Sequence, residues 1–168
     1  MTENKLKAML IDIQRCSMYD GPGVRTSVFL KGCPLSCKWC HNPESQSFRP
    51  QLAFHSGLCS GCKSCALVCP DVHSFPNDQH RVDFSKCITR GKCIENCPTG
   101  ALKIYGKEFT VDEVMEIVKR DRVYYEQTGG GLTISGGEPF AQFEFLMLLL
   151  KAAKSEHIHT CVETCGYA

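Results

Sequence analysis

The feature that most constrains this chain is its cysteine content, because thirteen of its 168 residues are cysteine. Thiols at this density either pair as disulfides or bind metal. An odd number argues against a closed set of disulfides, and residues 1–7 are polar and charged, without the apolar segment of a secretory signal. We therefore expect reduced, metal-binding thiols in a cytoplasmic protein.

The rest of the composition is that of an ordinary globular domain. Hydrophobic residues make up 43% of the chain, and 19 basic residues nearly balance 18 acidic residues. Such a chain can bury a core, and it has no basic excess that would favour binding to nucleic acid or an anionic membrane. The longest apolar segment, 143–150, is too short and too charged to span a bilayer. We expect no nucleic-acid or membrane partner.

The order of apolar and turn segments predicts an α/β fold with an inserted module. Apolar and β-branched runs predict strands, and helical spacing after a capping box at Thr110 and Glu113 predicts a helix that ends before Gly129. The expected strands are 26–30, 132–134 and 159–162, with an extended segment at 7–13 and a second helix at 143–153. Between the first and second strands, residues 48–102 hold seven cysteines and many turn residues, which indicates a small module organised by metal.

Three cysteines follow the first predicted strand in the spacing Cys33-x3-Cys37-x2-Cys40. The carboxyl end of a strand is where α/β proteins place their chemistry. Three thiolates favour zinc, copper or an iron–sulfur cluster, and no fourth ligand follows at ligand spacing. We interpret this loop as the site of a [4Fe-4S] cluster with one iron open to a non-protein ligand. A structural zinc site completed by His41 is the alternative.

Two further cysteine runs lie in the inserted module. Cys59-x2-Cys62-x2-Cys65-x3-Cys69-Pro70 has the spacing and trailing proline of a bacterial ferredoxin. The second run keeps Cys87, Cys93, Cys97 and Pro98, but Arg90 stands where its second cysteine belongs. The fourth cysteine of each such run ligates the other cluster. This pattern gives one cluster Cys59, Cys62, Cys65 and Cys97, and it leaves a second cluster one ligand short, with Cys69, Cys87 and Cys93.

The sequence leaves the form of the second cluster open. It fits a three-iron cluster, a cubane with a solvent or side-chain ligand, or a cubane completed by a remote thiol. The minor candidates for the side chain are His55, His73 and His80. A pair of zinc knuckles is the alternative for the whole module, although the spacing fits it poorly. The cysteines outside the runs are expected to be buried free thiols: Cys16, Cys161 and Cys165.

A glycine-rich turn, Ser135-Gly136-Gly137-Glu138-Pro139, follows the second predicted strand. Without side chains, the glycines let a ligand approach main-chain carbonyls, and carbonyls beside a carboxylate suit an ammonium group. A phosphate loop would instead offer amides, a lysine and a hydroxyl. The turn is therefore a candidate ammonium site, with an ordinary turn as the alternative.

These motifs, together with Asp20-Gly21-Pro22-Gly23-Val24-Arg25 and Glu163-Thr164-Cys165-Gly166-Tyr167, resemble those of the radical S-adenosylmethionine (SAM) enzymes that activate glycyl radical enzymes. The resemblance covers the whole chain, and the ferredoxin-like insertion resembles the branch that activates dehydratases, decarboxylases and carbon–nitrogen or carbon–sulfur lyases. It implies a partial radical SAM (β/α) barrel, with about three of the family's six strands, and an inserted two-cluster module. The implied segments are a core at 1–47, an insertion at 48–104 and the continued core at 105–168. We therefore expect the chain to cover only the N-terminal half of such an enzyme.

The resemblance also implies an enzymatic function. Cys33, Cys37 and Cys40 would hold a [4Fe-4S] cluster whose open iron binds SAM. Reductive cleavage of SAM would give a 5′-deoxyadenosyl radical that removes hydrogen from a glycine of the partner enzyme, with reduced ferredoxin or flavodoxin as electron donor. The corresponding cofactor-binding positions are Trp39 and His41 beside the adenosine, the cluster ligand Cys40 between them, Gly136, Gly137 and Glu138 near the methionyl ammonium, and Glu163 and Thr164 near the amino group and a monovalent cation.

The resemblance also bears on the cation site and on the approach of the partner. Many relatives carry Asp at position 163, so Glu163 is a departure at the implied cation site. Asp20 and Arg25 correspond to positions that line the approach of the partner's glycine loop, and a plain Asp-Gly-Pro-Gly turn is the alternative.

Two other functions compete with an activating enzyme. A ferredoxin-like electron-transfer protein would use only the insertion, and it leaves Cys33, Cys37 and Cys40 without a role. A zinc-stabilised interaction module would be colourless, whereas iron–sulfur protein is brown. The full set of motifs favours the activating enzyme.

Overall fold

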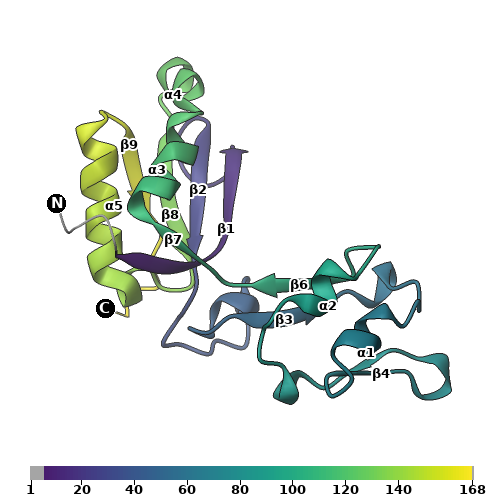
Figure 1. Ribbon diagram of the computed structural model, residues 1–168. Helices are drawn as coiled ribbons and strands as arrows, with labels where there is room; N and C mark the ends of the chain where they lie inside the picture. The colour runs from purple at the N-terminus through teal and green to yellow at the C-terminus, as the bar shows by residue number, and fades with distance from the viewer. Residues whose placement is uncertain (1–5, 168) are drawn as a thin grey trace. The chain divides into compact units, whose positions relative to one another are not determined.

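The computed structural model describes residues 6–167. The chain forms two compact units, one from Met1–Arg49 and Gly106–Ala168 and the other from Pro50–Tyr105 (Figure 1). Residues 1–5, on which part of the argument against a secretory signal rests, lie outside the described residues, as does residue 168. Within residues 6–167, no helix has both the length and the apolar character needed to cross a membrane.

The first unit is built on a five-stranded sheet in the order β7-β1-β2-β8-β9. Its parallel strands β2 (Arg25–Leu30), β8 (Gly131–Gly136) and β9 (His159–Val162) confirm the three strands that the sequence predicts. Strands β1 (Lys7–Ser17) and β7 (Lys107–Thr110) extend the sheet with antiparallel pairing. Because β2, β8 and β9 are parallel neighbours, the loops that follow them start from the same edge of the sheet.

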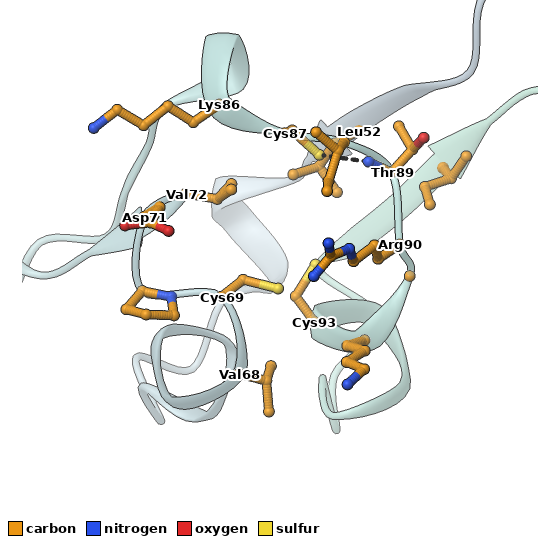
Figure 2. A pocket seen from close by; sticks show the side chains of 15 residues that line it. Leu52, Val68, Cys69, Asp71, Val72, Lys86, Cys87, Thr89, Arg90 and Cys93 are labelled. Atoms are coloured by element: carbon orange, nitrogen blue, oxygen red, sulfur yellow. Dashed lines mark hydrogen bonds between the residues drawn. The ribbon is translucent and has the colours of Figure 1, made fainter.

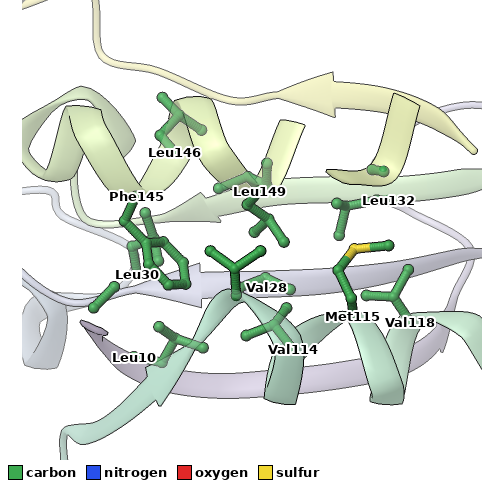
Figure 3. Packing of buried hydrophobic residues seen from close by; sticks show 14 of the residues in the cluster. Leu10, Val28, Leu30, Val114, Met115, Val118, Leu132, Phe145, Leu146 and Leu149 are labelled. Carbon is green, nitrogen blue, oxygen red and sulfur yellow. The ribbon is translucent and has the colours of Figure 1, made fainter. Parts of the chain in front are cut away.

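Two helices cover one face of this sheet (Figures 1 and 3). Helix α3 (Val111–Lys119) begins at the predicted capping box, in which Thr110 and Glu113 bond each other's main chain, and α5 (Phe143–Ser155) packs beside it. Apolar residues at alternate strand positions point to the same face, as strand geometry requires. The core between the two layers includes Ala8, Leu10, Val28, Leu30, Leu132 and Ile134 from the strands and Val114, Met115, Val118, Leu146 and Leu149 from the helices.

The helix predicted to continue to Gly129 is broken, so that prediction is wrong at its middle. Helix α3 ends at Lys119, and α4 (Arg122–Thr128) follows Asp121, whose φ of −99° and ψ of 8° are not helical. The Asp121 side chain is fully buried and accepts hydrogen bonds from Arg15 (Nη2–Oδ1, 2.6 Å) and Thr26 (Oγ1–Oδ2, 2.6 Å). Burial raises the pKa of Asp121, but these hydrogen bonds outweigh it and hold the pKa below its usual range.

Replacing Asp121 with asparagine is expected to lower the free energy of unfolding by about 2 kcal/mol at neutral pH, because hydrogen bonds to a charged group are lost. The folded-state pKa lies below the unfolded value of about 4, so the carboxylate stabilises the fold above that pH and loses its effect as the pH falls through the folded-state pKa. Urea unfolding of both proteins from neutral to acidic pH measures this. The difference between them should shrink in acid, and a constant difference would contradict the assignment.

The second unit, Pro50–Tyr105, has little regular structure. Strand β3 (Gln51–Phe54) pairs with β6 (Leu102–Tyr105), and β4 (His73–Ser74) pairs with β5 (Arg81–Val82). Helices α1 (Ser64–Val68) and α2 (Lys92–Glu95) each span about one turn. The 3₁₀ segments of the whole chain are η2 (Pro43–Ser45), η3 (Ser56–Leu58), η4 (Pro76–Asp78), η5 (Phe84–Lys86) and η6 (Pro139–Gln142). The buried cluster of this unit includes two cysteines, Cys65 and Cys93, beside its few apolar residues.

Candidate metal centres and ligand site

Three loops identified from the sequence meet at the carboxyl ends of β2, β8 and β9. The turn after β8 is bound to the chain that leads into the first cysteine loop, because Gly137 N donates to Leu30 O (2.8 Å) and Glu138 N donates to Gly32 O (2.9 Å). Ser135 Oγ donates to Glu163 Oε2 (2.6 Å), which connects the same turn to the loop after β9. The start of the cysteine loop, the glycine-rich turn and the loop after β9 are therefore held together by hydrogen bonds, which makes them one candidate site.

The Glu138 carboxylate is the centre of this arrangement. It is 1% exposed and accepts hydrogen bonds from Phe140 N (3.0 Å), Thr164 Oγ1 (2.9 Å), Cys165 N (2.9 Å) and Cys165 Sγ (2.7 Å). Burial raises the pKa of Glu138, but the hydrogen bonds outweigh it and the pKa lies below its usual range. The residue is therefore an ionised carboxylate that joins the loops after β8 and β9.

The two glycines of the turn are required by the protein's own backbone. Gly136 has a φ of +109°, and a Cβ there would lie 2.2 Å from Leu30 O. A Cβ on Gly137 would lie 2.3 Å from Gly32 O. The close approach of the turn to the end of β2 is therefore enough to require glycine at both positions, and the approach of a ligand to them stays a prediction.

The first three cysteines lie on a loop that is fixed near its two ends. Gly32 N donates to Ser45 O (2.7 Å) and Cys33 N donates to Gln46 O (3.1 Å). The thiols of Cys33, Cys37 and Cys40 are free and half-buried. Soft, accessible thiols in a set of three fit an iron–sulfur cluster with one open iron. Nearby, Trp39 is 85% exposed and His41 is exposed, so both rings are accessible from solvent.

Asp20 lies in the turn before β2, and Arg25 is the first residue of that strand. Arg25 is completely buried and donates to Thr133 Oγ1 (2.5 Å), Pro22 O (2.9 Å) and Leu132 O (2.7 Å). Asp20 Oδ2 accepts from Ser17 Oγ (2.7 Å) and Ser27 Oγ (2.5 Å). Both residues fix the turn to the sheet, and their contact with a partner's glycine loop stays a prediction.

The seven cysteines of the second unit line two separate cavities. Cys59, Cys62, Cys65 and Cys97 line a tight cavity of about 10 Å³, and Cys69, Cys87 and Cys93 line one of about 180 Å³ (Figure 2). Burial, then the Cys69 and Cys87 thiols, raise the pKa of Cys93 to about 11, so metal binding must displace a proton there. The division follows the two sets of the crossed ferredoxin pattern, and the clusters themselves stay a prediction.

Two histidines lie with the first set of cysteines. His80 Nδ1 is 3.4 Å from Cys59 Sγ, and His80 Nε2 is 3.6 Å from Cys65 Sγ and 3.0 Å from His73 Nδ1. The ligand atoms of Cys65, His73 and His80 all lie within 4.8 Å of one another. No histidine, His55 included, lines the cavity of Cys69, Cys87 and Cys93 in the described chain, so the suggestion that one completes the second cluster is wrong.

The cysteines outside the runs are not buried, so that expectation is also wrong. Cys16 and Cys165 are exposed, and Cys161 is half-buried. Cys165 Sγ donates to Glu138, and this hydrogen bond raises the pKa of the Cys165 thiol. The position of Cys165 directly after the loop residues Glu163 and Thr164 was the signal in the sequence that connects it to the site.

Comparison with known proteins finds relatives that are all named activating enzymes. Residues 19–168 match the family described as 4Fe-4S single cluster domain. The chain is 48% identical to the isethionate sulfite-lyase activating enzyme of Oleidesulfovibrio alaskensis, over 99% of this chain and 56% of that protein. It is 46% identical to the choline trimethylamine-lyase activating enzyme of the same organism (96% and 54%) and 40% identical to the trans-4-hydroxy-L-proline dehydratase activating enzyme of Clostridioides difficile (97% and 55%).

The chain thus spans about half the length of the curated relatives it matches. Their names confirm the resemblance to activating enzymes that the motifs indicated, and they do not favour a ferredoxin. The chain therefore belongs to the 4Fe-4S single cluster domain family and is a relative of the radical SAM enzymes that activate glycyl radical enzymes.

Proposed function

We propose that this chain carries the SAM-binding part of an enzyme that activates a glycyl radical enzyme. The observation that supports this most is the meeting of three loops at one sheet edge: the Cys33, Cys37 and Cys40 loop, the glycine-rich turn and residues 163–165. When bound, a [4Fe-4S] cluster and SAM supply the chemistry, reductive cleavage of SAM to a 5′-deoxyadenosyl radical that removes hydrogen from a glycine of the partner.

The residues of the site would bind and orient SAM. Cys33, Cys37 and Cys40 would hold three irons and leave the fourth for the amino and carboxylate groups of SAM. The ionised Glu138 supplies negative charge for the ammonium group, and the exposed ring of Trp39 offers a surface for the adenine. The remaining positions of the proposed site are His41, Gly136, Gly137, Glu163 and Thr164, the last two with a monovalent cation.

The inserted unit would supply electrons to this site. In this proposal it is a ferredoxin-like module with one or two further iron–sulfur clusters, reduced by ferredoxin or flavodoxin, within a partial radical SAM barrel. The two cysteine-lined cavities support this. The thirteen free thiols support a reducing compartment, for which we propose the cytoplasm. The relatives are named for lyases and a dehydratase, so the proposed partner is a glycyl radical enzyme of one of these classes.

Electron paramagnetic resonance tests the proposal on the anaerobically reconstituted, dithionite-reduced chain, with and without SAM. We expect a cluster signal that shifts when SAM is added, because SAM becomes a ligand of the open iron. Adenosine, which lacks the methionyl amino and carboxylate groups of SAM, should leave the spectrum unchanged. Reduced clusters that respond equally to SAM and adenosine, or to neither, would contradict SAM binding by this chain and favour the electron-transfer alternative.

A further inference from the structure

We propose that the site of Cys69, Cys87 and Cys93 holds a three-iron cluster, whose open corner faces Arg90, and not a four-iron cubane. This inference rests on one part of the proposed function, namely that the Pro50–Tyr105 unit binds iron–sulfur clusters. It assigns a role to the one position where the second cysteine run departs from the ferredoxin pattern.

The site has the donors and the space for a cluster. Cys69 and Cys93 point toward each other, and Cys87 lies on another side of the cavity of about 180 Å³ (Figure 2). Thr89 N lies 3.4 Å from Cys87 Sγ and donates to it, an interaction that stabilises a thiolate ligand. Cys93 is 5% exposed, so a group bound there would be shielded from water.

Among residues 6–167, no fourth thiol or imidazole lines this cavity. Arg90 stands at the position of the missing cysteine, and its side chain reaches into the cavity in Figure 2. A guanidinium carries only N–H donors, has no free lone pair and keeps its proton, so it cannot replace a thiolate as an iron ligand. Lys86 and Lys92 also line the cavity, and they add positive charge.

The charge of Arg90 acts differently on the two cluster types. In a four-iron cubane, the fourth iron is a cation without a protein ligand, and it would lie beside a permanently charged guanidinium. In a three-iron cluster the same corner exposes negatively charged sulfide, which accepts the N–H groups of arginine in charge-assisted hydrogen bonds. The same side chain therefore disfavours the fourth iron and stabilises the corner that lacks it.

The competing oxygen ligand is Asp71, which also lines the cavity. Asp71 is exposed, and its carboxylate lies on the side of the cavity away from Arg90 in Figure 2. A carboxylate ligand at the fourth iron would have to approach the corner that Arg90 faces. The geometry therefore favours the three-iron form. The Asp71→Asn variant is included in the test to exclude this carboxylate as a ligand.

The test is electron paramagnetic resonance of mildly oxidised, reconstituted protein in which Cys33, Cys37 and Cys40 are replaced by alanine. An oxidised four-iron cluster is silent in this state, whereas a three-iron cluster gives a nearly isotropic signal. We expect that signal, with an integrated intensity equal to the protein concentration.

Arg90→Cys should remove the signal and add one iron per chain, and Arg90→Lys, the matched control, should keep it. Cys93→Ala should lose the signal because the site loses a ligand.

The opposite results would overturn the inference. One such result is an oxidised protein without a paramagnetic resonance signal whose iron content equals that of the Arg90→Cys variant. The other is a three-iron signal that appears only after Asp71→Asn. Should the triple alanine variant fail to fold, the same comparison between the unaltered chain and Arg90→Cys decides, because the Cys33 loop contributes equally to both. SAM binding is measured with Cys33, Cys37 and Cys40 intact, so the proposed function and this inference can each fail alone.

Discussion

Replacement of Cys37 by alanine is expected to abolish the effect of SAM on the cluster spectrum while the clusters of the Pro50–Tyr105 unit still assemble. The proposed SAM-binding cluster has only three protein ligands, so the loss of one leaves two thiols and no substitute at ligand spacing. In the complete enzyme we expect SAM cleavage to fall by more than about 100-fold, beyond the loss typical of changes around a metal ligand. Iron content, the reduced spectrum and the release of 5′-deoxyadenosine measure the three effects.

The matched control is Cys161→Ala, which removes one thiol from the same unit. Cys161 is half-buried and lies on β9, outside every cysteine run. Its replacement should change neither the iron content nor the response to SAM. A Cys37→Ala protein that still responds to SAM would show that the cluster of this loop is not the SAM site, and equal losses in both variants would indicate damage to the fold.

The parallel part of the fold could be predicted from the sequence because its signals are local. Each of β2, β8 and β9 is a short run of apolar or β-branched residues bounded by turn residues. The pairing of β1 with β7 could not be predicted in this way, since it joins segments far apart in the chain. The break before α4 was missed for a similar reason: it depends on Asp121 meeting Arg15 and Thr26, which only the tertiary structure brings together.

The candidate site was partly predictable from the positions of its motifs relative to the strands. Motifs that follow parallel neighbouring strands must meet at one edge, so the order of strands and motifs was sufficient to bring the three loops together. The hydrogen bonds from Thr164 and Cys165 to Glu138 were not predictable, because the sequence pattern assigns the carboxylate to a ligand and not to the protein. The sequence identified the gap at Arg90, whereas only the cavity shows which ligands are absent around it.

Replacement of Gly136 by alanine is expected to destabilise the carboxyl edge of the sheet by about 3 kcal/mol, the upper part of the range for overpacking in a tightly packed site. A Cβ at this position would lie 2.2 Å from Leu30 O and 2.4 Å from Leu30 N. Both atoms belong to the backbone of β2, which is paired with β8 and cannot move aside without breaking that pairing. The φ of +109° adds strain, because residues other than glycine rarely adopt this backbone angle.

The cost of the close approach can be separated from the cost of the backbone angle. Gly129 also has a positive φ, +69°, but a Cβ there would meet nothing within 4 Å, so Gly129→Ala should cost only about 1 kcal/mol. Amide hydrogen exchange of β2 and β8 measures both variants locally, and Gly136→Ala should speed exchange far more. Because the turn is bound to Leu30 and Gly32, directly before Cys33, the Gly136 variant should also lose the response to SAM. Equal exchange in both variants would mean that only the backbone angle requires glycine, and that the turn does not position the cysteine loop.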